Sequence, residues 1–217
     1  MTKRVLAIGA HADDGVFWCG ATLLKAAEQG HQVDYLSITK NVGDEQVDAM
    51  TRLCREHGMG FRTLGFSSQD LAVDLPTKRT VAAAVAAIRP DVALVMWPHD
   101  LHHDHCMAGQ LGFIPLRQGH RLHDQPFTIP ERTLYYEAGP AHSLNFRPSV
   151  YVDVTCVWDR YREFLRRAAC DILKHPGIET KEILAQYRAL ETNRGFTHTA
   201  RYAEAFTPAD HYLQDIV

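Results

Sequence analysis

The stretch Arg4-Val-Leu-Ala-Ile-Gly-Ala-His-Ala-Asp-Asp-Gly15 decides how the rest of this sequence is interpreted. Its first part is a short apolar run that ends in glycine, a pattern typical of a strand buried on both faces of a parallel sheet. Its second part is polar and carries His11, Asp13 and Asp14. Because parallel sheets bind ligands beyond the carboxyl ends of their strands, we expect these side chains to face a binding crevice.

Strand and helix patterns alternate over the first half of the chain. Besides the first strand, strands are predicted at 32–39, 61–66 and 91–97, and helices at 17–29, 45–57 and 76–89. Strands that alternate with helices of this length indicate βαβ units and a mostly parallel sheet. The predicted fold class is therefore α/β, a Rossmann-like three-layer sandwich with a mostly parallel sheet, and its binding site is expected at the carboxyl ends of the first and fourth strands.

The second half of the chain is less regular. We predict helices at 106–116, 158–174 and 179–191, strands at 133–136 and 149–153, and an irregular tail. No internal repeat or linker divides the sequence, and 217 residues suit one domain. Residues 1–217 are therefore expected to form a single domain.

Composition argues against several classes of protein. Hydrophobic residues make up 46% and charged residues 23%, which is ordinary for a folded chain and unlike a disordered or fibrous one. The longest apolar run, 81–88, is far shorter than the roughly 20 residues that span a bilayer, so no membrane partner is expected. The net charge of −3 and the lack of a basic stripe argue against nucleic acid as a partner.

The cysteines favour a reducing compartment. There are 5 of them, widely spaced and without a Cys-x-x-Cys pair, which argues against a disulfide scaffold and against a cysteine zinc site. The apolar run after the basic start is also too short for the core of a signal peptide. We therefore expect a cytoplasmic protein.

Histidine is over-represented, with 13 residues. Four of them lie close together, directly after the strand predicted at 91–97: His99, His102, His103 and His105. If this strand neighbours the first one, the two polar clusters face each other across one crevice. Two histidines and one carboxylate with an open position are typical of a catalytic zinc site, and a further carboxylate can act as the general base on the attacking water.

Several ordered segments give the sequence a resemblance to the LmbE-like (PIG-L) zinc-dependent N-deacetylases. They keep the family's order and extend over roughly positions 4 to 206: His11-Ala-Asp-Asp14, Cys19-Gly-Ala-Thr-Leu23, Gly30-His-Gln-Val33, Arg89-Pro-Asp-Val92, His102-His-Asp-His105, Tyr151-Val-Asp-Val-Thr155 and Tyr202-Ala-Glu-Ala-Phe206. The resemblance implies that Zn²⁺, or another divalent ion, is bound by His11, Asp14 and His105. It also implies that Asp13 is the general base.

The second motif supplies two further roles by the same resemblance. His102 corresponds to the residue that stabilises the developing oxyanion, and Asp104 corresponds to a supporting residue that orients an imidazole. Three positions depart from the family's pattern: Ala12 and His103 stand where proline is usual, and Gly15 stands where glutamate is frequent.

The activity implied by the resemblance is removal of an N-acetyl or other acyl group from a small amino sugar or glycoconjugate by a homo-oligomeric enzyme. Asp13 would take a proton from the attacking water and deliver it to the departing amine, and a protonated His102 would stabilise the oxyanion. The family arginine that often holds a sugar has no clear counterpart near Glu45. The resemblance implies no particular substrate-binding residues for this chain.

Other functions remain open from the sequence. One is an amidase that acts on a non-sugar or thiol-conjugate amide, and another is a non-catalytic α/β metal-binding module. A nucleotide-binding domain predicts Gly-x-Gly-x-x-Gly after the first strand, but Asp13 and Asp14 at that place would repel a pyrophosphate.

Structural interpretations are favoured for the residues that surround the motifs. His99 and His103 are expected to lie at the rim of the site or to contact backbone, and Asp70 is expected to be an ordinary turn residue. Asp100 either caps its loop or touches substrate. The cysteines that flank the motifs, Cys19 and Cys106, are expected to be buried in helices rather than to bind metal.

Overall fold

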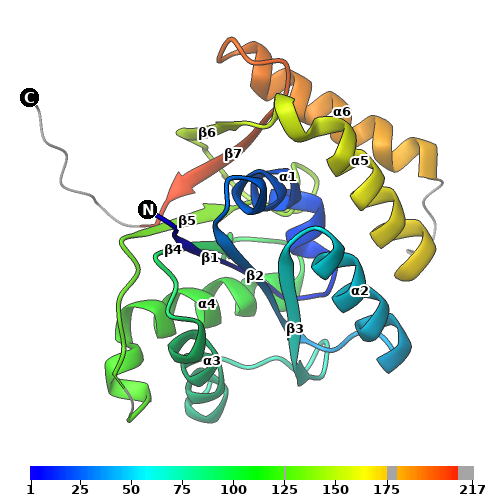
Figure 1. Ribbon diagram of the computed structural model, residues 1–217. Helices are drawn as coiled ribbons and strands as arrows, with labels where there is room; N and C mark the ends of the chain where they lie inside the picture. Colours follow the sequence, from blue (N-terminus) through cyan, green and yellow to red (C-terminus); the bar gives the residue numbers. More distant parts are fainter. Residues whose placement is uncertain (125, 175–179, 210–217) are drawn as a thin grey trace, which may run out of the picture.

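A seven-stranded sheet forms the centre of the molecule, in the order β3-β2-β1-β4-β5-β7-β6 (Figure 1). The structure is a computed structural model that describes residues 1–124, 126–174 and 180–209. Strands β3, β2, β1, β4 and β5 are parallel, and β7 runs antiparallel to both β5 and β6. The predicted α/β class and the mostly parallel sheet are confirmed.

The first half alternates strands and helices as the hydrophobic pattern predicts. Its elements are β1 (Arg4–Gly9), α1 (Asp14–Glu28), β2 (Gln32–Thr39), α2 (Asp44–Glu56), β3 (Met59–Phe66), α3 (Leu75–Ile88), β4 (Val92–Met96) and α4 (His103–Leu122). The turn after α1 uses Gly30 at φ +81°, a backbone conformation that glycine adopts without steric cost. Helix α4 extends beyond the predicted 106–116 at both ends: it begins three residues earlier, where His102 caps it, and it continues six residues further, to Leu122.

The second half contains one element that the sequence did not reveal. Its elements are β5 (Arg132–Tyr136), β6 (Val150–Asp153), the 3-10 turn η1 (Thr155–Val157), α5 (Trp158–Arg166), the π-helical turn η2 (Arg167–Ile172), α6 (Thr180–Phe196) and β7 (Ala203–Pro208). The prediction of an irregular tail was wrong for residues 203–208, and residues 210–217 of that tail lie outside the described residues. Residues 203–206 of β7 are all buried, so the strand shows no alternation of apolar and polar residues. Position 179 of the predicted helix 179–191 lies outside the described residues.

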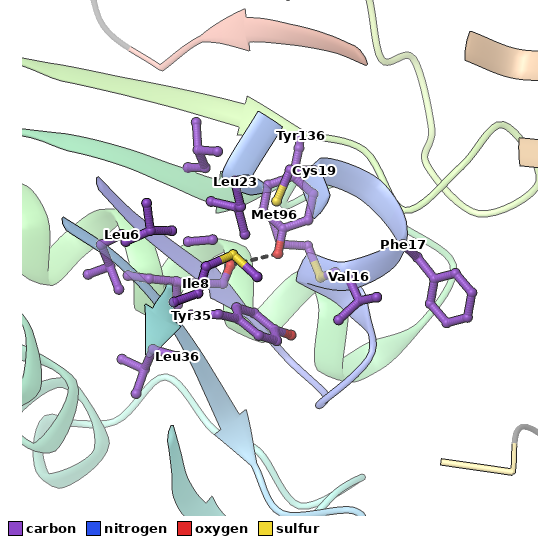
Figure 2. Packing of buried hydrophobic residues seen from close by; sticks show 14 of the residues in the cluster. Leu6, Ile8, Val16, Phe17, Cys19, Leu23, Tyr35, Leu36, Met96 and Tyr136 are labelled. Atoms are coloured by element: carbon purple, nitrogen blue, oxygen red, sulfur yellow. Dashed lines mark hydrogen bonds between the residues drawn. The ribbon is translucent and has the colours of Figure 1, made fainter. Parts of the chain in front are cut away.

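The helices form a layer on each side of the sheet (Figure 1). Helices α3 and α4 cover one face, and α1, α2 and α5 cover the other, with α6 beside α5 and β7. Apolar side chains pack on both faces of the sheet (Figure 2): Leu23 of α1 covers one face, and Ile8 of β1 faces α4 on the other, 3.5 Å from the place that a Cβ at Gly112 would take. Tyr136 is fully buried in the core and its hydroxyl donates to the carbonyl oxygen of Ile8 at 2.9 Å. Among the described helices, none combines the length and apolar character that a membrane crossing requires.

Candidate functional site

Two helices begin at the same edge of the sheet, because β1 and β4 are parallel neighbours. Helix α1 follows β1 with Asp13 at its N-cap, and α4 follows β4 with His102 at its N-cap. The adjacency of the first and fourth strands is therefore confirmed. It brings the two polar clusters of the sequence together.

The buried residues His11, Asp14 and His105 form one cluster with the spacing of metal ligands. Nδ1 of His11 lies 3.6 Å from Oδ2 of Asp14, and Nε2 of His105 lies 3.5 Å from Oδ1 of Asp14. Ligand atoms about 2.0–2.1 Å from a tetrahedral Zn²⁺ are themselves separated by about 3.4 Å. The cluster therefore fits a divalent ion, and three ligands leave a position for a reactant.

A second group with ligand spacing, His11 with His102 and Asp104, is less suited to a metal. The carboxylate of Asp104 already accepts from the hydroxyl of Ser68 at 2.6 Å and from the backbone amide of Gln69 at 2.9 and 3.0 Å. It also contacts Nε2 of His11 at 3.0 Å. Asp104 thus holds the ring of His11 with Nδ1 toward Asp14, as expected of a supporting residue.

His105 is held from its other side by Asp100. Nδ1 of His105 hydrogen-bonds to Oδ1 of Asp100 at 3.0 Å, which leaves Nε2 facing Asp14. Oδ1 of Asp100 also accepts from the backbone amide of His102 at 2.9 Å, so Asp100 does cap its loop. The contact with His105 was missed from the sequence, because a five-residue separation across a loop has no fixed geometry.

The histidines of the second cluster separate into two groups. The ring of His102 stacks on that of His105, with centroids 4.6 Å apart, and lies 5.0 Å from that of His11. His103 points elsewhere, and its Nε2 contacts the carbonyl oxygen of Leu71 at 3.0 Å. His99 is exposed and packs against Trp97. The interpretation of His103 as a backbone-contacting residue is therefore confirmed, whereas the place of His99 at the rim stays a prediction.

The hydrogen bonding of His102 differs from the protonated form expected above. The backbone amide of Asp104 donates to Nδ1 of His102 at 3.2 Å, so this nitrogen is an acceptor and the proton belongs on Nε2. Burial, together with the nearby charges of His105 and His11, lowers the pKa of His102. The structure therefore favours a neutral His102 that donates through Nε2.

The carboxylates in and around the cluster outnumber its two histidines, so the site attracts protons or cations. Burial alone would lower the pKa of His11, but its hydrogen bond to Asp14 and the charges of Asp14 and Asp13 raise that pKa to about 9. Burial of His105 is likewise outweighed by Asp100 and Asp14, which raise its pKa to about 10. Burial of Asp14 would raise its pKa, yet the two histidines hold it well below the usual range. A bound cation would replace these protons.

Asp13 lies beside this cluster without being part of it. It is half-buried at the N-cap of α1, and its charge acts on His11. Neither group with ligand spacing among the described residues includes Asp13. Its place at the edge of the cluster is compatible with the role of general base.

Tyr35 explains why glycine stands at position 15. Its hydroxyl donates to the carbonyl oxygen of His11, and its ring lies against the first turn of α1. A Cβ at Gly15 would lie 2.5 Å from Cε2 of Tyr35. The tyrosine therefore occupies the space that the family's frequent glutamate would need, and it supports the His11 turn from the core side.

Two further buried residues support α1 and were not expected from the sequence. The carboxylate of Glu204, on β7, accepts from the backbone amides of Ala21 and Thr22 at 3.0 and 2.7 Å. The hydroxyl of Tyr161, on α5, donates to the carbonyl oxygens of Val16 and Phe17. The only sequence signal for Glu204 was an acidic residue within an apolar segment of the resemblance.

The remaining residues singled out in the sequence lie away from the cluster. Sγ of Cys19 is buried and donates to the carbonyl oxygen of Gly15, and Sγ of Cys106 donates to that of Asp100. Asp70 is exposed. Both cysteines belong to helices, as expected, but Cys106 is half-buried rather than buried, and neither is in a group with ligand spacing among the described residues.

Comparison with known proteins identifies the family. Residues 6–114, half of the chain, match the PIG-L family, which is described as GlcNAc-PI de-N-acetylase. The chain belongs to the PIG-L family. The matched residues include all three members of the buried His11, Asp14 and His105 cluster. A relative in sequence, the uncharacterized deacetylase YaiS of Escherichia coli (strain K12), is 27% identical over 166 residues, which are 70% of this chain and 82% of the relative.

Several solved structures share the fold of this chain. The conserved protein TT1542 from Thermus thermophilus superposes with a TM-score of 0.83, 22% identity and coverage of 99% of this chain and 98% of that chain. GalB, the 4-carboxy-2-hydroxymuconate hydratase from Pseudomonas putida KT2440, superposes with a TM-score of 0.80 and 17% identity, and the match covers 100% of both chains. The N,N'-diacetylchitobiose deacetylase from Pyrococcus horikoshii superposes with a TM-score of 0.77 and 19% identity, and the match covers 95% of this chain and 83% of that chain. At these identities the likeness shows the fold, and the PIG-L match together with YaiS supports an enzyme that removes acetyl groups.

Proposed function

We propose that this PIG-L protein is a metal-dependent N-deacetylase that acts on a small N-acylated amino sugar, with His11, Asp14 and His105 as the metal ligands. The observation that carries the proposal is the buried cluster of these three residues at the carboxyl ends of β1 and β4. Two imidazoles, one carboxylate and an open position are the donor set of hydrolytic zinc sites.

The chain's own residues divide the work of amide hydrolysis. A divalent ion, when bound, polarises an amide carbonyl and makes water more acidic. Asp13, at the edge of the cluster, takes the proton of the attacking water and passes it to the departing amine. Nε2 of His102 donates to the developing oxyanion, which a neutral imidazole can do as the oxygen becomes negative. Asp104 holds His11 in place from outside the cluster.

A hydratase is the second candidate, because GalB shares the fold over its whole length. The charges around the cluster disfavour it for this chain. Four carboxylates surround the site, those of Asp13, Asp14, Asp100 and Asp104, and they would repel a substrate that carries several carboxylates itself. An uncharged N-acyl sugar, whose deacetylated product is an amine, is more compatible with this negatively charged site.

The test begins with metal-free protein reloaded with Zn²⁺, Co²⁺ or Mn²⁺. We expect one ion per chain and release of acetate from N-acetylglucosamine derivatives, with activity lost on chelation and restored by the metal. Thiol-conjugate amides test the amidase alternative, and 4-carboxy-2-hydroxymuconate tests the hydratase. Full deacetylation by protein whose metal content is confirmed near zero would refute the mechanism.

We further propose a cytoplasmic homo-oligomer with no nucleic-acid or membrane partner. All five cysteines are free, which supports a reducing compartment. Light scattering coupled to size-exclusion chromatography tests the assembly, and a monomer at micromolar concentration would contradict it.

A further inference from the structure

Two loops pair next to the metal cluster and form a short ribbon. Asp100 and Ser143 make an antiparallel bridge, and two backbone hydrogen bonds of 3.0 and 2.8 Å join residues 99–101 to residues 142–144. Successive side chains of an extended strand point to opposite faces. Asp100 and Ser143 therefore share one face of this ribbon, which is the face that meets His105.

The carboxylate of Asp100 is fully enclosed and bonded on both oxygens. Oδ1 meets Nδ1 of His105 at 3.0 Å and accepts from the amide of His102 at 2.9 Å. Oδ2 accepts from the hydroxyl of Ser143 at 3.0 Å. These bonds fix the direction from which the carboxylate of Asp100 meets His105.

Ser143 ties this arrangement to the sheet. Its Oγ accepts from the backbone amide of Ala138 at 2.8 Å, so its hydroxyl hydrogen is directed to Asp100. Ala138 lies two residues after the end of β5, the strand that neighbours β4. The support of His105 thus runs from β5 through Ser143 and Asp100 and does not depend on α4 alone.

We propose that Asp100 is a positioning residue that fixes His105 in its metal-binding orientation, and that Ser143 holds Asp100 in place for this task. The inference rests on the proposed function, since it treats His105 as a metal ligand. A carboxylate bonded to Nδ1–H selects the tautomer whose Nε2 lone pair faces Asp14, and it makes Nε2 a better donor to a cation. Loss of such a partner typically weakens metal affinity 10–100-fold.

The experiment measures metal affinity rather than turnover. Metal-free wild type, Asp100→Asn and Ser143→Ala compete for Zn²⁺ with a chromophoric chelator, and Asp159→Asn, an exposed position on α5, is the matched control. We expect Asp100→Asn to weaken Zn²⁺ binding about 10–100-fold. Ser143→Ala should weaken it by a smaller factor, because the bond between Asp100 and His105 survives, and the control should match wild type.

Two additional measurements separate positioning from a general loss of structure. The absorption spectrum of the Co²⁺-loaded protein reports ligand geometry and should change in Asp100→Asn, while thermal unfolding of the metal-free variants reports folding. Wild-type affinity and an unchanged Co²⁺ spectrum in Asp100→Asn would overturn the proposal. If that variant does not fold, Ser143→Ala decides the matter, and wild-type affinity there would overturn it. A wild-type protein that binds no divalent ion would instead refute the proposed function.

Discussion

The turns into α1 and α4 both carry metal-ligand candidates after a parallel strand, but they are supported differently. The turn into α1 is held by groups of the core: Tyr35 donates to the carbonyl of His11, and Glu204 accepts from amides further along the helix. The loop and first turn of α4 instead hold the ligand rings themselves, because Asp100 bonds directly to the ring of His105 and Asp104 to that of His11. We therefore expect that removing the residues that support the α1 turn lowers the stability of the fold. Removing the residues on the α4 side that hold the ligand rings should instead lower metal affinity.

The largest effects are expected from the ligand candidates themselves. Asp14→Ala and His105→Ala should abolish stoichiometric Zn²⁺ binding, because each removes one of three donors. Asp13→Ala should keep the metal and lose about 10²–10⁴-fold in kcat, the usual contribution of a general base. Metal analysis and acetate release check both effects. If the Asp13→Ala protein lost the metal while the Asp14→Ala protein kept it, the roles of general base and metal ligand would be exchanged between these two residues.

The next effect distinguishes the adjacent histidines at the start of α4. His102→Ala should lower kcat about 10²–10³-fold with the metal retained, since it removes an oxyanion donor. His103→Ala should cost only a few-fold, because its ring contacts the carbonyl of Leu71 instead of the cluster. Steady-state kinetics on metal-loaded protein make the comparison. Loss of metal or of most activity in His103→Ala alone would show that the second motif is misassigned by one position.

Variants of the residues that support α1 should lower the free energy of unfolding. Glu204→Gln replaces one acceptor oxygen with a donor facing a backbone amide, so we expect the free energy of unfolding to fall by about 1–3 kcal/mol. Tyr161→Phe should cost less, about 1 kcal/mol, because only its hydroxyl bonds are lost. Urea unfolding measures both, with Tyr151→Phe as a control. The Zn²⁺ affinity of folded Glu204→Gln should remain near wild type, and a drop like that expected for Asp100→Asn would erase the contrast between the two turns.

The smallest effect concerns Glu191, a buried carboxyl on α6 near Glu204. Burial, aided by the charge of Glu204, raises the pKa of Glu191 to about 9, and its Oε2 has no hydrogen-bond partner within the described part of the chain. The folded state therefore holds this proton more tightly than the unfolded one. The stability that Glu191 contributes is present below its ordinary pKa and is lost as pH rises toward 9.

Urea unfolding of metal-free protein at pH 6 and pH 9 tests this linkage. The fall in stability over that interval should be smaller in Glu191→Gln than in wild type, whereas the exposed control Glu45→Gln should keep the wild-type slope. Equal slopes in all three proteins would show that Glu191 is already ionised at pH 6.

Much of the fold was predictable because its first half follows simple periodicities. Buried strands read as apolar runs, and the turn after α1 ends in a glycine with positive φ. Strand β7 was not predictable, since it is buried on both faces and contains Glu204. Its carboxylate is tolerated there because it meets two helix amides from α1, a long-range contact without a sequence pattern.

The sequence by itself determined the residue types and order of the site: His11, Asp13 and Asp14 after one strand, and His102 to His105 after another. Their types specify oxygen and nitrogen donors, and the strand pattern places them at one edge of a sheet. Only the tertiary structure decided which nitrogen of each imidazole faces Asp14, that His102 is an acceptor at Nδ1, and that Asp100 serves His105. These features depend on hydrogen bonds between loops distant in sequence, whose directions are set only when the sheet brings the loops together.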